Sequence, residues 1–144
     1  MPEHDPLVRL LHMRDYAEAA LRLSERGNRR LLDEDEMYSF SMIHAVAMIG
    51  QTAAQVSREV QQAAPEIPWT DIIGMRHRLI HGYEFVRHDI VWDTVTVDVP
   101  DLLPKLFRLI DQMQAAADVT PHAPAAEDET HPAAENSPED LSTS

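Results

Sequence analysis

The side chains of this sequence that are best suited to chemistry lie in one short segment, PEIPWTDIIGMRHRLIHGY, at residues 65–83. His81 titrates near neutral pH, with an ordinary pKa of about 6.5, and can give or accept a proton. Arg76 carries a permanent positive charge that can hold a phosphate group. Together they suit cleavage of an RNA phosphodiester bond, in which the ribose 2′-hydroxyl attacks the adjacent phosphate and no metal ion is required.

The spacing of these two side chains sets a geometric condition. Five residues correspond to a rotation of about 140° on an ideal α-helix, so Arg76 and His81 do not share one face. Either the helix loosens before Gly82, or two subunits supply the groups across a twofold axis. This spacing occurs often by chance, and a surface arginine with a histidine that caps a helix is the structural alternative.

A metal site is a competing interpretation of the same segment. His77 and His81 are four residues apart and share a helical face, and Asp71 or Glu84 could complete a set of three ligands. The neighbouring arginines and the absence of the glutamate pattern of a zinc protease disfavour this site. We therefore expect no metal and no other cofactor.

The composition predicts one folded domain followed by an acidic tail. The chain has 144 residues, of which 44% are hydrophobic, enough for one ordinary core. We expect a domain of residues 1–118 and a disordered tail of residues 119–144, which is rich in Pro, Ala, Glu and Ser. The tail holds six acidic residues and no lysine or arginine, which leaves 19 acidic against 12 basic residues elsewhere. RNA would therefore be repelled on average and would need a local basic patch.

No segment has the pattern of an export signal or a membrane span. The N-terminal residues, MPEHDPLVRL, lack a basic stretch followed by a long apolar run, and no later segment approaches the roughly 18 apolar residues of a membrane helix. We therefore expect a soluble cytoplasmic protein. The absence of cysteine excludes disulfides and thiolate metal ligands.

Helical periodicity positions the motif within a predicted all-α domain. Asp5 and Pro6 form an N-cap with proline at the first helical position, and an apolar stripe predicts a helix that ends near Gly27. The stripe consists of Leu7, Leu10, Leu11, Ala17 and Leu21.

The second predicted helix begins at a capping box of Asp33 and Glu36 and runs to about Ala63. Its first half is apolar on two sides, so it needs two neighbours, one of which could be another subunit. His44 and Gln51 lie on the second side and would need polar partners there.

A third helix is predicted from Trp69 to His81, with Gly82 suited to end it, so the motif sits at a helix end. The following residues, DIVWDTVTVDVP, alternate like a strand, but the sequence offers no second strand to pair with them. We therefore expect helical turns from Asp89 and a last helix at residues 101–117.

The sequence resembles the HepT-like branch of the HEPN superfamily, small helical toxins encoded beside minimal nucleotidyltransferase antitoxins. The resemblance runs from LLHMRDYAEAAL through AVAMIGQTAAQVS and the segment at residues 65–83 to IVWDTVTVDVPDLLPKL. Its most specific part is the family pattern of Arg, usually Asn, three residues, His, one residue and Tyr. Arg76, His81 and Tyr83 match this pattern, whereas His77 stands in place of the asparagine. Gln51 and Thr52 replace the Glu-Ala that usually follows Ile-Gly in the second helix.

This resemblance implies an all-α, HEPN-like bundle of about four to five helices that works as a homodimer. It implies a metal-independent endoribonuclease, with the motifs of two subunits lining one cleft. By the same resemblance, His81 is the general acid or base, and Arg76 orients the scissile phosphate and stabilises its developing charge. Tyr83 is the position at which a cognate nucleotidyltransferase antitoxin transfers AMP from ATP, which neutralises the toxin by filling the cleft with charge and bulk.

Several cations near the motif are candidates for RNA contacts. His77, Arg78 and Arg87 lie close to it in sequence, and Arg26, Arg29 and Arg30 are expected in the loop after the first helix. Solvated surface charge is the alternative reading for all of them. The alternative function is a noncatalytic helical module that binds a nucleotide or a protein.

Overall fold

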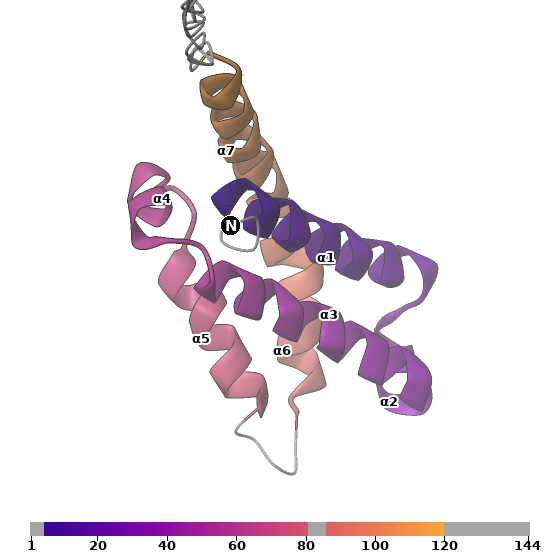
Figure 1. The fold of residues 1–144 in the computed structure, drawn as a ribbon. Helices are drawn as coiled ribbons and strands as arrows, with labels where there is room; N and C mark the ends of the chain where they lie inside the picture. The colour runs from indigo at the N-terminus through magenta and orange to yellow at the C-terminus, as the bar shows by residue number, and fades with distance from the viewer. Residues whose placement is uncertain (1–4, 81–85, 120–144) are drawn as a thin grey trace, which may run out of the picture.

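The computed structural model describes residues 5–80 and 86–119, except for the side chains of Arg76, Ile80 and Val119, and every regular element in them is a helix. The all-α prediction is therefore confirmed, and Figure 1 shows the arrangement. Four helices of 12 to 21 residues form the bundle, and shorter helices join them. In chain order the elements are α1 (Pro6–Arg26), α2 (Arg29–Glu34), α3 (Glu36–Ala54), α4 (Arg58–Ala63), α5 (Trp69–Ile80), α6 (His88–Asp93), the π-helix η2 (Thr94–Asp98) and α7 (Val99–Val119).

Helix α1 begins where the sequence predicts. An Asp5 side-chain oxygen accepts a hydrogen bond from the Leu7 backbone N–H at 2.9 Å, and Pro6 is the first helical residue. The helix ends at Arg26, directly before Gly27. Its predicted apolar stripe faces the core, together with two residues that complete the buried surface, Met13 and Ala20.

The predicted second helix is wrong in its bounds, because three helices occupy this region instead of one. Each begins at a polar side chain that accepts a backbone hydrogen bond: Asn28 caps α2, Asp35 caps α3 and Ser57 caps α4. The capping residue of α3 is therefore Asp35 and not Asp33. At the break before α4, the Gln61 amide donates to two main-chain carbonyls near the end of α3, which satisfies groups that the interrupted helix leaves unpaired.

A close contact fixes the start of α3 against the end of α1. The Tyr38 hydroxyl donates a hydrogen bond of 2.7 Å to the Leu23 carbonyl. A β-carbon at Gly27 would lie 2.7 Å from the Tyr38 ring, too near for a normal contact. Glycine at this position therefore lets the ring reach its hydrogen-bond partner.

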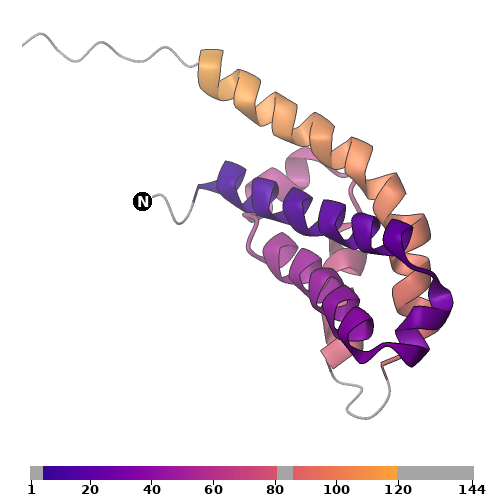
Figure 2. The ribbon, with the colours of Figure 1, turned by 90° about the vertical axis from the view of Figure 1, so that its right-hand side faces the viewer.

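Helix α3 is the central element of the bundle. It packs against α1 and α5, while α1 also packs against α7 (Figures 1 and 2). The core side chains that α3 contributes are Met42, Ala45, Val46, Ile49 and Ala53. Its second apolar side, which the sequence predicts, is open: Met37 is 79% exposed and Phe40 is 65% exposed.

The segment after residue 87 forms one continuous run of helix, made of α6, η2 and α7. This confirms the prediction of helical turns, and not a strand, in this segment. The run bends in Figure 2, and three local features account for the bend. The hydroxyls of Thr94 and Thr96 bond to carbonyls four residues earlier, η2 widens one turn, and Pro100 and Pro104 have no N–H to donate.

The predicted tail of residues 119–144 lies outside the described residues apart from Val119, where α7 ends. Among the helices of residues 5–80 and 86–119, none combines the length and hydropathy needed to cross a membrane.

Candidate functional site

The structure describes the two sides of the motif segment and not its centre. Arg76 belongs to α5, but its side chain is not described, and His81, Gly82, Tyr83 and Glu84 lie outside the described residues. The relative positions of the Arg76 and His81 side chains therefore stay a prediction.

Both flanks of the motif segment are fixed to the core. Leu79, in the last turn of α5, is buried in the core, and Val86 packs against the same core from the other side of the segment. The described residues on either side of residues 81–85 are therefore anchored to the core by hydrophobic contacts.

The predicted RNA contacts have different surroundings. His77 and Arg78 are exposed on α5, and Arg87 is exposed at the N-cap of α6 without a side-chain capping bond. The prediction that Arg29 and Arg30 lie in a loop is wrong, because both lie in α2 and pair with carboxylates of the same helix. Arg26 is the last residue of α1. Of the predicted RNA contacts, His77 and Arg78 of α5 and Arg87 at the N-cap of α6 are therefore the nearest to the motif in the sequence.

A polar network ties the start of α6 to α2 and α3. Arg29 pairs with Asp33 at 3.0 Å and with Asp89, which lies 60 residues away in sequence. The Nδ1 atom of His88 lies 2.8 Å from Asp33, and its Nε2 atom lies 3.4 Å from the Ser39 hydroxyl. Because a carboxylate can only accept, His88 donates from Nδ1. The network therefore holds α6, which begins five residues after Tyr83, beside α2 and α3.

The charges of the network stabilise one another. The pKa of Asp33 is lowered, chiefly by its hydrogen bond from His88 and then by the one from Arg29. The pKa of Arg29 is raised, chiefly by its hydrogen bond with Asp89 and then by the one with Asp33. At neutral pH the Asp33 carboxylate and the Arg29 guanidinium are therefore both charged.

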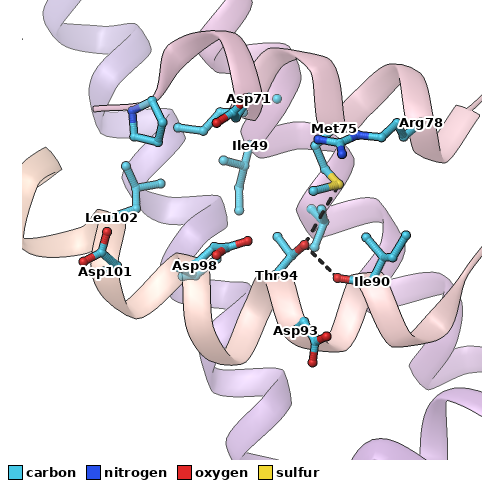
Figure 3. Close-up of a pocket in the computed structure, with 15 residues that line it drawn as sticks. Ile49, Asp71, Met75, Arg78, Ile90, Asp93, Thr94, Asp98, Asp101 and Leu102 are labelled. Carbon is cyan, nitrogen blue, oxygen red and sulfur yellow. Dashed lines mark hydrogen bonds between the residues drawn. The ribbon is translucent and has the colours of Figure 1, made fainter. Parts of the chain in front are cut away.

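A cavity of about 520 Å³ opens between α5 and the run of α6, η2 and α7, with α3 behind it (Figure 3). Most of its lining is apolar, and four aspartates, one arginine and one threonine complete it. It is lined by Val46, Ile49, Gly50, Pro68, Asp71, Ile72, Met75, Arg78, Ile90, Asp93, Thr94, Asp98, Val99, Asp101 and Leu102. We call this cavity the acidic groove.

The charge of the acidic groove is unsuited to RNA. Its four carboxylates, on Asp71, Asp93, Asp98 and Asp101, would repel phosphates, and Arg78 is the one cation among the described residues that line it. Burial raises the pKa of Asp98, and the three neighbouring carboxylates raise it further. Apart from Arg78, which is also a predicted RNA contact, the lining of the acidic groove is therefore unsuited to RNA.

The alternative metal site cannot be built from the described residues alone. Within residues 5–80 and 86–119, no three His, Asp or Glu side chains lie close enough to hold a metal ion. Two of the proposed ligands, His81 and Glu84, fall outside these ranges, so this alternative stays untested.

Sequence reasoning missed the polar network and the acidic groove. Both depend on contacts between distant segments, such as Arg29 with Asp89 or Asp71 with Asp98. The one local signal was the periodic placement of Asp93, Asp98 and Asp101 around the last helices, which by itself is typical of a solvated helix face.

Comparison with known proteins gives one consistent family. The model of a family described as "Ribonuclease HepT-like" matches residues 13–109, which span the bundle and the motif. A curated protein of Thermococcus cleftensis named "Probable ribonuclease HepT" is 33% identical over 102 residues, covering 68% of this chain and 92% of that protein.

Two more distant relatives agree with this result. They are candidate RNases of Methanocaldococcus jannaschii, 20% and 21% identical over 114 residues, and the matches cover 79% of this chain and 94% and 98% of theirs. No solved structure gives a significant match.

The raised pKa of Asp98 leads to a prediction about stability. A carboxyl with a raised pKa binds its proton more tightly in the folded state, so the free energy of unfolding falls as the pH rises above the ordinary aspartate range. Asp98→Asn removes this penalty. We expect it to stabilise the protein near pH 7 by roughly a few tenths of a kcal/mol, because the side chain is largely exposed and water screens it, and to have no such effect near pH 3.

Thermal unfolding followed by circular dichroism at the two pH values measures this effect. Asp111→Asn, which removes an exposed carboxylate of α7 outside the groove, is the matched control. A lower melting temperature for Asp98→Asn than for wild type near pH 7 would contradict the prediction.

Proposed function

Because the chain belongs to the HepT-like ribonuclease family, we propose that it is the toxin of a toxin–antitoxin pair and cleaves RNA through Arg76 and His81 without a metal ion. The observation that carries this proposal is the family match over residues 13–109, which includes both residues of the motif. The names of the curated relatives, which are RNases, support the reaction class. We further propose that it acts in the cytoplasm, where its RNA substrate is made.

The proposed reaction needs only proton transfer and charge stabilisation. His81 accepts the proton of the ribose 2′-hydroxyl as its oxygen attacks the phosphorus, and the bond to the 5′-oxygen breaks as that oxygen gains a proton. The products are a 2′,3′-cyclic phosphate and a 5′-hydroxyl. Arg76 holds the phosphoryl oxygens, on which negative charge grows in the transition state. Its guanidinium can bind two of these oxygens at once.

The surroundings of the motif support phosphate binding at this end of the bundle. Arg78 and Arg87 add positive charge close to the motif in a chain whose net charge is −13, and His77 is exposed next to Arg78 on α5. Because the total charge repels RNA, these local cations must supply the attraction, and cleavage should weaken as salt rises.

A homodimer is the proposed working form, and the open side of α3 is its proposed contact surface. Met37 and Phe40 are the most exposed large apolar side chains described, and the rings of Tyr16 and His44 meet edge to face on the same side of the bundle. Phe40 directly follows Ser39, whose hydroxyl lies 3.4 Å from His88. Pairing two copies here would bring both α6 starts, and with them both motif segments, toward the twofold axis.

The proposed protein partner is a nucleotidyltransferase antitoxin that attaches AMP to Tyr83. An added phosphate next to Arg76 and His81 would compete with RNA for the same positive charge. The alternative function, a noncatalytic binding module, is favoured by no specific contact among the described residues, and the first experiment below distinguishes it.

The first experiment compares RNA cleavage by wild type and variants in the presence of a chelator. We expect His81→Ala and Arg76→Ala to lose at least about 100-fold in rate, which is the lower end of the contribution of a general acid or base. Arg108→Ala, which removes an exposed arginine of α7, should retain activity. Fragment ends should carry cyclic phosphate. Equal cleavage by wild type and His81→Ala would contradict the proposal, and no cleavage by unmodified wild type would favour the binding module.

The second experiment tests the dimer surface. Phe40→Glu places a charge in the middle of the open side of α3 and should convert a dimer into a monomer of 16.3 kDa, measured by light scattering after size exclusion. RNA cleavage should fall with the dimer fraction. Phe107→Glu, at a partly exposed phenylalanine of α7, is the matched control and should leave the dimer intact. A wild-type monomer, or a Phe40→Glu dimer, would refute the proposed contact.

The third experiment tests the modification. Incubation with the cognate nucleotidyltransferase, ATP and Mg²⁺ should add AMP to wild type and abolish RNA cleavage, as followed by intact mass and by gel. Tyr83→Phe should gain no mass, while Tyr16→Phe, at a half-buried tyrosine of α1, should be modified like wild type. Modification that persists in Tyr83→Phe would show that another residue is the acceptor.

A further inference from the structure

The acidic groove has an apolar floor that the described part of the chain does not fill. Ile49 of α3, Ile72 and Met75 of α5 and Ile90 of α6 face it, together with Leu102 of α7 (Figure 3). A volume of about 520 Å³ is enough for one or two large side chains. Apolar surface left in contact with water at the bottom of a groove is a source of binding energy.

The rim of the groove carries charge that the described residues leave unmatched. Asp101 pairs with Lys105 at 2.9 Å. Asp71, Asp93 and Asp98 have no ion pair or side-chain hydrogen bond with any described residue, and their mutual repulsion helps to raise the pKa of Asp98. A cation bound here would relieve this repulsion, and among the described residues Arg78, at one end of the groove, is the one cation of the lining.

An irregular turn of helix presents part of this rim. The backbone N–H of Val99 bonds to the Thr94 carbonyl five residues earlier, which is the π-helical pattern of η2. Thr94 and Asp98, the first and last residues of η2, both line the groove. Single π-helical turns are rare and occur frequently at functional sites.

From the apolar floor and the acidic rim, we infer that the groove docks a segment of a partner protein that carries a large apolar side chain flanked by lysines or arginines. Charge decides among the possible occupants. The tail of this chain has six acidic residues and no lysine or arginine, so it would be repelled, and RNA is repelled in the same way. A polyamine would match the rim but would leave the floor without an apolar anchor.

This docking surface is separate from the proposed catalytic residues. It uses Asp71, Ile72 and Met75 of α5, whereas the motif uses Arg76 and the segment after it. The inference therefore does not depend on RNA cleavage and can be tested in the catalytically inactive His81→Ala variant.

The test uses a labelled amphipathic peptide with leucines at i, i+3, i+4 and i+7 and with lysines and arginines between them. Binding to the full chain, measured by fluorescence anisotropy, should have a Kd on the order of 10–100 μM. A peptide with glutamates in place of the basic residues should not bind. The double variant Asp71→Asn/Asp98→Asn should bind about tenfold more weakly, because two charge pairs are lost. The matched control Glu59→Gln/Asp111→Asn removes two exposed carboxylates outside the groove and should bind like wild type.

Methyl NMR of methionine-labelled protein locates the contact. The Met75 methyl should shift on binding, whereas Met37, which is exposed on the other side of α3, should not. Unchanged affinity in the Asp71→Asn/Asp98→Asn variant, or a shift of Met37 in place of Met75, would overturn the inference. Equal binding of a peptide with alanine in place of leucine would also overturn it. A shift of the Met75 methyl with spermidine alone would overturn it by indicating a polyamine as the ligand. A shift of the Met75 methyl with protein concentration alone would overturn it by indicating a second copy of this chain.

Discussion

The arrangement of this protein depends on one constraint, that α3 is apolar on more than one side and cannot be covered by a single neighbour. Burying a large apolar side chain stabilises a fold by about 1.5–3 kcal/mol, and α3 contributes Met42, Val46 and Ile49 to the core. Helices α1 and α5 both pack against it, so their relative positions follow from its surface. Because the motif begins in α5, the position of Arg76 is set by how α5 lies on α3.

The charges are divided between two regions of the molecule. Three carboxylates without partners among the described residues gather at the acidic groove, while the network of Arg29, Asp33, His88 and Asp89 pairs its charges almost completely. Paired charges hold elements together, whereas unpaired charges of one sign strain the free protein and favour a ligand of the opposite sign. The same acidic excess that makes the chain a poor general binder of RNA therefore has a local use as a recognition surface.

Local rules of the sequence predicted much of the fold, and contacts between distant segments account for what they missed. The Asp5 cap, the stripe of α1 and the helical character of the TVTVD segment follow from nearest-neighbour chemistry and are confirmed. The prediction that Asp33 caps the second helix was wrong, because several acidic residues are close together in the sequence and Asp35 is the one that caps α3. Asp33 instead pairs with Arg29 and His88. The groove could not be predicted from the sequence, because periodicity shows which face of a helix is apolar but does not show which faces remain uncovered when two helices pack.

Helix α5 connects the two functions that we propose. It is a 12-residue helix, and its groove residues Asp71, Ile72 and Met75 directly precede the motif that starts at Arg76. A regular helix moves as one body, so any shift of α5 that accompanies docking in the groove would also move the backbone that carries Arg76. The binding free energies of RNA and of a docked partner are then linked through the position of this one helix, and each ligand must change the affinity for the other by the same factor.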